Sequence, residues 1–249
     1  MGMNTLKIAG INYPNIYVDS SLSYNKPEKN RELISIPGRS GDLVVDHGTW
    51  KNVPITYPCY AKDKAEFDWL IYQLASIRGY AKIECTDDTD HFRMGVPIIP
   101  QAPTVKRGGK DFYFDLNFNC KPQRFLTTGA QATDYTANAT IYNPKNETAR
   151  PIIVAYAAGS FKIEEVNNPH TEWTITVSSY PAGYLYGIAI DCETMECYFP
   201  GPSITDISAS ANQYVSISPN KYPYITYGGI RLKMGTMSKI TIVPRWWEI

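Results

Sequence analysis

The side chains that could perform chemistry in this 249-residue chain are few and widely separated. Its three histidines, His47, His91 and His170, each stand beside a turn, where a histidine is usually an ordinary surface residue. The acidic run Asp87-Asp88-Thr89-Asp90 could offer carboxylates to calcium, but the Gly and Glu that an EF-hand loop requires are missing, so a solvated turn is favoured. The sequence also lacks GxSxG, HExxH, GxGxxG and P-loop motifs. We therefore expect no enzyme, metal or cofactor; an enzyme would need these histidines and acids to converge in one cleft.

The cysteines do not indicate a metal site or a disulfide framework. An odd number and the lack of a CxxC pair argue against both, and Cys192 and Cys197 have no second pair or nearby His to complete a zinc site. We expect five free, buried or half-buried thiols in a protein that folds in a reducing cytoplasm: Cys59, Cys85, Cys120, Cys192 and Cys197.

Aromatic residues offer the remaining candidate for ligand binding. The chain has 19 Tyr, and Trp173, in the run His170-Thr171-Glu172-Trp173, is the natural candidate for stacking against a sugar. The alternative is that Trp173 and the tyrosines fill a thin core with their polar tips at its edge, and we favour it.

The bulk composition indicates a folded, β-rich protein with no general affinity for nucleic acid. Hydrophobic residues make up 43% of the chain, which suffices for a packed core, and 24 basic residues balance 24 acidic ones. The residues up to Phe125 carry 30 charges and the rest carry 18, which predicts a domain boundary near this position. We expect no secretory signal, and the longest apolar stretch, Ile152 to Ala158, is too short to span a bilayer.

One amphipathic helix is predicted in the first half. Asp63 is a good N-cap, with Glu66 three residues later, and Gly79 is placed to end the helix. Between them a set of apolar residues recurs at helical spacing and forms one stripe: Phe67, Leu70, Ile71, Leu74 and Ile77.

The rest of the first half reads as strands and turns. Apolar residues flank the turns at Pro37-Gly38 and Gly41-Asp42, and Val53 to Tyr60 is a strand whose two prolines predict an edge or irregular position. Residues 81–86 and 92–99 resemble a hairpin. The turn Arg107-Gly108-Gly109-Lys110 precedes an alternation with Phe112, Phe114, Leu116, Phe118 and Cys120 on one face.

The second half contains short strand-like runs separated by turns and no helical period. The runs are Pro151 to Ala157, Phe161 to Glu165, Trp173 to Ser178, Tyr184 to Ile190, Gln213 to Ser218, Gly229 to Lys233 and Ile240 to Val243. This pattern predicts a β-sandwich or jelly roll.

Three stretches, in this order, resemble the distal tail protein (Dit) family of siphophages. The first runs from Ile34 to Leu43 and includes Pro37, Gly38, Arg39, Gly41 and Asp42, followed by Asp46-His47-Gly48-Thr49-Trp50-Lys51-Asn52. The second is Ala189 to Tyr198, with Asp191 in an I-D-x-E-T-M-x-x-Y pattern. The third is the end of the sequence, with Pro244, Arg245, Trp246 and Trp247.

The resemblance implies a mainly β protein of two domains. Residues 1–127 would form a ring-forming belt domain, a β-sandwich with one flanking helix, and residues 128–249 a galectin-like β-sandwich. The last residues would be able to dock back on the N-terminal domain. The chain would be a short form, because 249 residues leave no room for an inserted carbohydrate-binding module.

The function implied is that of a structural hub in the distal tail tip of the virion, assembled in the bacterial host cytoplasm. Six copies would close a ring between the tail-tube protein and the tail-associated protein, with receptor-binding or other baseplate proteins as further partners. DNA and tape-measure protein would pass through without specific binding. The alternative is a receptor- or carbohydrate-binding module, although the His-x-Asn-x-Arg cluster of sugar-binding galectin-like folds is not found beside Trp173.

Overall fold

The computed structural model describes residues 4–18, 25–100, 102–106, 108, 110–181 and 183–249. The chain divides into two compact units, one ending at Arg124 and also including Ile249, the other running from Phe125 to Glu248. Strands dominate both units. Among the described residues there is one α-helix, and no helix is long and apolar enough to cross a membrane.

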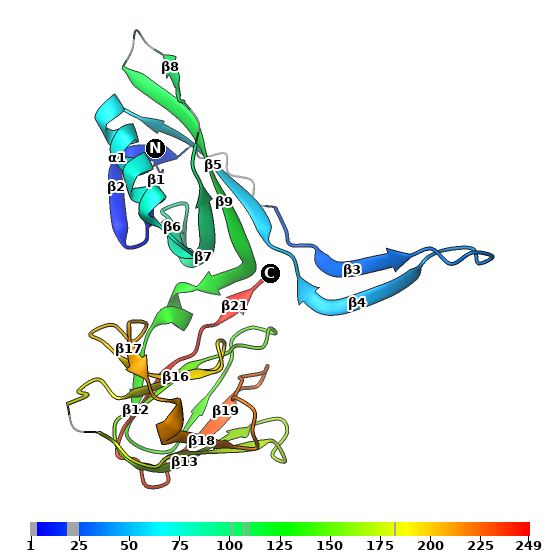
Figure 1. The fold of residues 1–249 in the computed structure, drawn as a ribbon, viewed down its shortest axis with the longest axis vertical. Coiled ribbons are helices and arrows are strands. Elements are labelled where there is room, and N and C mark those ends of the chain that lie inside the picture. Colours follow the sequence, from blue (N-terminus) through cyan, green and yellow to red (C-terminus); the bar gives the residue numbers. More distant parts are fainter. Residues whose placement is uncertain (1–3, 19–24, 101, 107, 109, 182) are drawn as a thin grey trace. The chain divides into compact units, whose positions relative to one another are not determined.

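The first unit is built on one antiparallel sheet that closes on itself (Figure 1). Its strands are β1 (Asn4–Ile8), β2 (Ile11–Val18), β5 (Val53–Ala61), β6 (Ala81–Cys85), β7 (Asp88–Ile98), β8 (Thr104–Lys106) and β9 (Asp111–Leu126). The order is β9-β5-β2-β1-β6-β7, and β7 also pairs with β9. The β-sandwich that the resemblance implies for this unit would have two separate sheets. The length of β9 explains the difference, because a 16-residue strand can pair with both ends of the sheet.

The alternation in β9 forms the centre of this unit, as predicted. Phe114, Leu116, Phe118 and Cys120 are buried in the core, whereas Asp115 and Asn119 are exposed. The hairpin of β6 and β7 and the hairpin of β8 and β9 also form as predicted, although Arg107 and Gly109 of the second turn lie outside the described residues.

The prediction of an edge or irregular position for the Val53 strand holds for only part of it. β5 lies between β2 and β9 in the sheet. However, β2 pairs with only the last three residues of β5, Cys59 to Ala61, whereas β9 pairs along its whole length. Pro54 and Pro58 therefore lie in the part of β5 that has one strand neighbour in the described sheet, where a missing N–H is tolerated.

Helix α1 (Lys64–Ser76) begins where the sequence predicts and ends earlier. The Asp63 carboxylate accepts a hydrogen bond from the backbone N–H of Glu66 at 2.9 Å, and Phe67, Leu70 and Leu74 are buried against the sheet. The helix ends at Ser76, and its C-cap is Ile77, whose backbone is extended, so Gly79 is not the cap. The partly buried Ile77 packs against the core of the unit.

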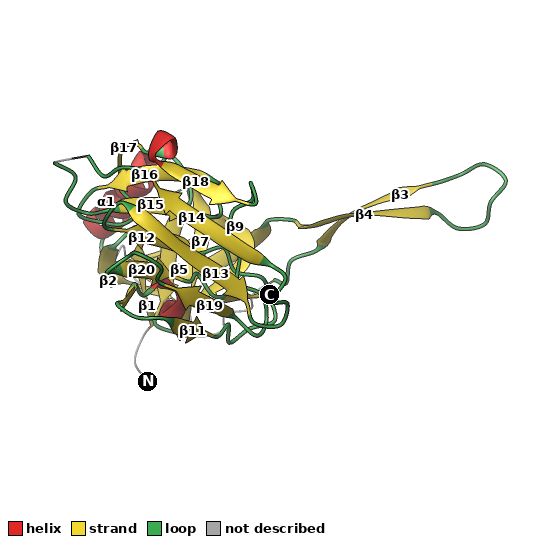
Figure 2. Cartoon of the chain, turned by 90° about the horizontal axis from the view of Figure 1, so that it is seen from below, coloured by secondary structure: helices red, strands yellow, loops and turns green. Residues whose placement is uncertain are grey.

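The predicted strands around the Pro37-Gly38 turn form a separate two-stranded hairpin, which we call the arm. It consists of β3 (Lys29–Ile34) and β4 (Leu43–Trp50) with the turn between them. Figure 2 shows the arm projecting away from the strands of the first unit.

The second unit contains two antiparallel sheets that share one core. The six-stranded sheet has the order β10-β20-β12-β15-β16-β17 and the five-stranded sheet the order β11-β19-β13-β14-β18. Buried side chains from both sheets, such as Ile153 and Phe161, belong to the same apolar cluster.

Seven strands of this unit overlap the predicted runs, and five lie outside them. The predicted ones are β12 (Ile152–Ala155), β13 (Gly159–Glu165), β14 (Glu172–Val177), β15 (Ile188–Asp191), β18 (Val215–Ser218), β19 (Ile230–Lys233) and β20 (Ile240–Val243). The others are β10 (Thr133–Tyr135), β11 (Ala139–Ile141), β16 (Glu196–Pro200), β17 (Ile207–Ser210) and β21 (Trp247–Glu248); two 3-10 turns, Thr127–Ala130 and Asn212–Tyr214, complete the unit.

Candidate assembly interface

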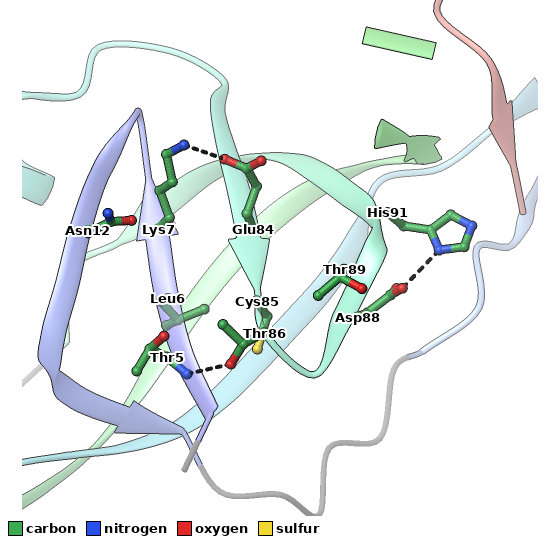
Figure 3. Close-up of a pocket in the computed structure, with 10 residues that line it drawn as sticks. All are labelled: Thr5, Leu6, Lys7, Asn12, Glu84, Cys85, Thr86, Asp88, Thr89 and His91. Atoms are coloured by element: carbon green, nitrogen blue, oxygen red, sulfur yellow. Dashed lines mark hydrogen bonds and ion pairs between the residues drawn. The ribbon is translucent and has the colours of Figure 1, made fainter. Parts of the chain in front are cut away.

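A polar pocket beside β1, β6 and the start of β7 brings His91 together with Asp88 and Glu84, whereas His47 and His170 are not part of its lining (Figure 3). It has a volume of about 210 Å³. Lys7 and Glu84 face each other across 3.5 Å, and His91 Nδ1 lies 2.9 Å from a carboxylate oxygen of Asp88. The one thiol in the lining belongs to Cys85, and burial raises its pKa, so it is protonated at neutral pH and a poor nucleophile.

The other two histidines lie outside this pocket. His47 lies on the arm, 3.9 Å from Glu32, and His170 lies in an exposed turn of the second unit. Asp88, the candidate calcium ligand, binds Arg124 as well as His91. In the described part of the chain no three His, Cys, Asp or Glu side chains are placed to hold a metal ion.

All five cysteines are free and buried, as the sequence predicts. Burial raises the pKa of Cys120 and of Cys197 to about 11, so these thiols are protonated and unreactive at neutral pH.

Trp173 belongs to the core of the second unit. Its side chain is 2% exposed and its ring meets the Tyr224 ring edge to face, with centroids 4.9 Å apart. A sugar cannot reach it, so the interpretation of Trp173 as a core residue is confirmed and its candidacy as a sugar platform was wrong.

The arm is the most unusual surface of the molecule, because its apolar side chains have no cover. Every residue from 31 to 44 is exposed. Leu33 and Val44 are directly opposite each other across the hairpin and are 64% and 56% exposed. The next pair, Ile34 and Leu43, is 39% and 41% exposed, and side chains alternate between faces along a strand, so both faces of the arm carry an apolar pair.

The first motif occupies the outer half of this arm. Pro37 and Gly38 make the turn, where Arg39 N–H donates to the Ile36 carbonyl oxygen at 3.1 Å, and Gly41 and Asp42 lead into Leu43 at the start of β4. At the inner end, Arg31 Nε binds an Asp46 carboxylate oxygen at 3.0 Å, and the other oxygen accepts from Gly48 N–H at 2.9 Å. These contacts hold the hairpin together without covering its apolar pairs.

The second and third motifs meet in the second unit, where Arg245 forms ion pairs with Asp191 and, at 3.5 Å, with Glu193. The Arg245 guanidinium donates to both carboxylate oxygens of Asp191, each at 2.7 Å. Burial on its own would raise the pKa of Asp191, but Arg245 and the backbone N–H groups of Glu193 and Thr194 outweigh it and hold this pKa below its ordinary value. The pair is therefore ionised at neutral pH and locks the end of the chain to the hairpin between β15 and β16.

The residues on either side of Arg245 are packed closely. Pro244 is buried, and the Trp246 side chain is 7% exposed within the core of the unit. A Cβ on Gly129 would lie 2.3 Å from the Trp246 backbone nitrogen, so only glycine fits there. Trp247 is partly buried and its Nε1–H donates to the Thr148 carbonyl oxygen at 3.0 Å. Neighbouring side chains of a strand point to opposite faces, so one of two adjacent tryptophans is expected to be buried, and here it is Trp246.

No protein-family model and no curated protein matches the sequence. Solved structures do match it, and those described here are components of phage tail machinery. The chain thus has the fold of phage baseplate hub proteins. One match is Dit (gp 19.1) of phage SPP1, described as a paradigm of the hub adsorption apparatus of phages that infect Gram-positive bacteria, with 13% identity and a TM-score of 0.60 over 97% of this chain and 98% of that one. Another is a chain of the phage P2 baseplate in its activated conformation with Ca, with 9% identity and a TM-score of 0.54 over the same shares of the two chains.

Proposed function

We propose that this chain is a distal tail protein that assembles into a ring, most simply of six copies, and serves as the structural hub of a phage tail tip. The first unit forms the ring, and the second is a galectin-like β-sandwich. The ring joins the tail-tube protein to the tail-associated protein, and DNA and tape-measure protein pass through it. The hub works by assembly and not by catalysis, and the virion tail tip is its final location.

The observation that carries this proposal is the uncovered arm. A two-stranded hairpin is at best marginally stable in water, and an exposed apolar hairpin invites pairing with another chain. The arm nevertheless keeps apolar pairs on both faces, Leu33 with Val44 and Ile34 with Leu43. These pairs lose contact with water if the arm lies against a second copy of the chain.

A ring follows from the geometry of such a contact. The arm of one copy would contact a different surface on the next copy, so the contact is heterologous. Heterologous contacts build a ring when the rotation from one copy to the next adds up to a full turn. The resemblance of the three sequence motifs to distal tail proteins implies a closed ring and not an open filament.

The balanced charge of the chain agrees with a passive conduit. The formal net charge is +0, so phosphates meet no net attraction as DNA passes. The described pocket pairs its charges internally and carries a protonated thiol.

The buried cysteines make the proposal testable with a single label. An environment-sensitive fluorophore on Leu33→Cys would be attached at the arm alone, because the five native thiols are buried and the label cannot reach them. We expect a blue shift of its emission as the concentration of the purified chain rises through the assembly range. The same label on Leu185→Cys, a position that is 81% exposed in the second unit, is the matched control and should not shift.

A label on Leu33→Cys that remains solvated while a ring forms would show that the arm is not the contact. A chain that stays monomeric at all concentrations, alone and when mixed with tail-tube and tail-associated proteins, would contradict the ring itself.

A further inference from the structure

Three loops of the second unit meet at one end of its five-stranded sheet and are joined by hydrogen bonds into one platform. They are residues 142–149, 166–171 and 222–229. The Asn143 side-chain amide donates to the Ile225 carbonyl oxygen at 3.1 Å, and the Val166 N–H donates to the Gly229 carbonyl oxygen at 3.0 Å. Asn143 is 4% exposed, so its hydrogen bonds are shielded from water and hold the first loop to the third.

Two tyrosines stand on this platform with most of their surface in water. Tyr142 is 69% exposed and Tyr227 is 62% exposed. A Cβ on Gly229 would lie 2.8 Å from the Tyr142 Cα, and Tyr227 is two residues before Gly229. Consecutive Cα atoms are about 3.8 Å apart, which places the two tyrosine Cα atoms within roughly 12 Å of each other. The two exposed side chains therefore arise from neighbouring positions of the platform.

The backbone beneath the tyrosines requires glycine at two adjacent positions. Gly228 and Gly229 have φ values of +101° and +90°. A Cβ would lie 2.2 Å from the Asn167 side-chain nitrogen at the first position and 2.0 Å from the Ile141 carbonyl oxygen at the second. The close approach fixes the Asn167 amide, whose nitrogen donates to the Tyr227 carbonyl oxygen at 2.8 Å. The Asn167 amide is thus held in one orientation against the backbone of Tyr227.

The surroundings of the two rings are polar and carry little free charge. The exposed neighbours in the same loops include Pro144, Asn146 and Asn168, and Lys145 pairs with Glu248. A protein-binding hot spot would place apolar neighbours around the anchors, and a phosphate site would gather basic ones. Aromatic faces with oriented amides suit a ligand that has both apolar C–H faces and many hydroxyl groups.

We propose that Tyr142, Tyr227 and Asn167 form a binding site for a neutral oligosaccharide. Each tyrosine supplies a ring face for a sugar, and the Asn167 amide hydrogen-bonds a hydroxyl or acetamido group. Because the loops are held before the ligand arrives, little conformational entropy is lost on binding. The site lies within the second unit and is independent of ring formation.

The test is binding of the full-length protein to an array of short neutral oligosaccharides built from hexose and N-acetylhexosamine, with calorimetry on the oligosaccharides that bind. We expect Tyr142→Ala and Tyr227→Ala each to weaken binding about tenfold, as expected for the loss of one aromatic contact. Tyr142→Phe should retain the affinity because the ring remains, and Asn167→Ala should reduce it. Tyr72→Ala is the matched control, because Tyr72 is 73% exposed on α1 in the other unit.

Absence of binding to every neutral oligosaccharide on the array would overturn the proposal, as would binding that the tyrosine variants leave unchanged. Variants that bind sugar normally but fail to join other tail proteins would show instead that the platform is a protein contact. Native mass spectrometry of the same variants separates this question from the ring, because their oligomeric state should equal that of the unsubstituted protein.

Discussion

Removal of residues Pro244 to Ile249 should destabilise the second unit severely. This deletion takes away the buried Trp246 side chain and leaves Asp191, whose side chain is 7% exposed, without its guanidinium partner. Truncation of a buried tryptophan costs roughly 3–5 kcal/mol. Breaking a buried ion pair by removal of one partner costs a similar roughly 3–5 kcal/mol. The two sites are adjacent, so the losses do not simply add, and we expect a decrease of about 5 kcal/mol in the free energy of unfolding.

Urea unfolding followed by tryptophan fluorescence and far-ultraviolet circular dichroism measures this loss. With a slope of about 2 kcal/mol per molar urea, the transition of the second unit should move down by about 2.5 M. Trp246→Ala isolates the packing contribution, and Trp247→Ala is the matched control, because Trp247 is only partly buried and should cost less. An unchanged midpoint and slope in the deletion variant would refute the reasoning and show that the end of the chain is dispensable.

Three further predictions follow from the arm, the ion pair and the thiols. Leu33→Glu combined with Val44→Glu should weaken ring formation about 100-fold, because about 3 kcal/mol of apolar burial is lost. Sedimentation velocity should show the weaker assembly, and the urea midpoint of the variant should stay unchanged. The pKa of Asp191 is lowered in the folded state, so its stabilisation is complete above its ordinary pKa of 3.8 and is lost as the pH falls through the lower folded value. Thermal melts between about pH 5 and pH 2.5 should therefore fall less steeply for Asp191→Asn than for the unsubstituted protein. Ellman titration without reductant should detect close to five thiols after denaturation and almost none before it. A single thiol, which would mean two disulfides, would contradict the prediction that the protein folds in a reducing cytoplasm.

Local patterns in the sequence predicted the local elements well. The start of α1 was predictable because a capping carboxylate and the N–H that it binds lie three residues apart at Asp63 and Glu66. The inward face of β9 was predictable because strand periodicity needs no knowledge of the partner strands. The end of α1 was not predicted in this way, since the helix ends at Ser76 and Gly79 is not its cap.

The assembly surfaces depend on contacts between distant residues and were harder to predict from the sequence. Nothing in the spacing of Asp191 and Arg245 shows that they pair, since 54 residues separate them; the sequence showed only that each belongs to a recognisable motif. Leu33 and Val44 have the composition of ordinary strand residues, and that both remain exposed becomes evident only when the hairpin is seen to leave the sheet. Tyr142 and Tyr227 gave no local signal, apart from the adjacent glycines at 228 and 229.

Native mass spectrometry of the purified full-length chain at micromolar concentration tests the central claim most directly. The account predicts a closed hexamer, six copies of the 28.0 kDa chain, and a loss of this species in the Leu33→Glu, Val44→Glu variant. A strict monomer that also fails to form a ring in the presence of its tail-tube and tail-associated partners would contradict it.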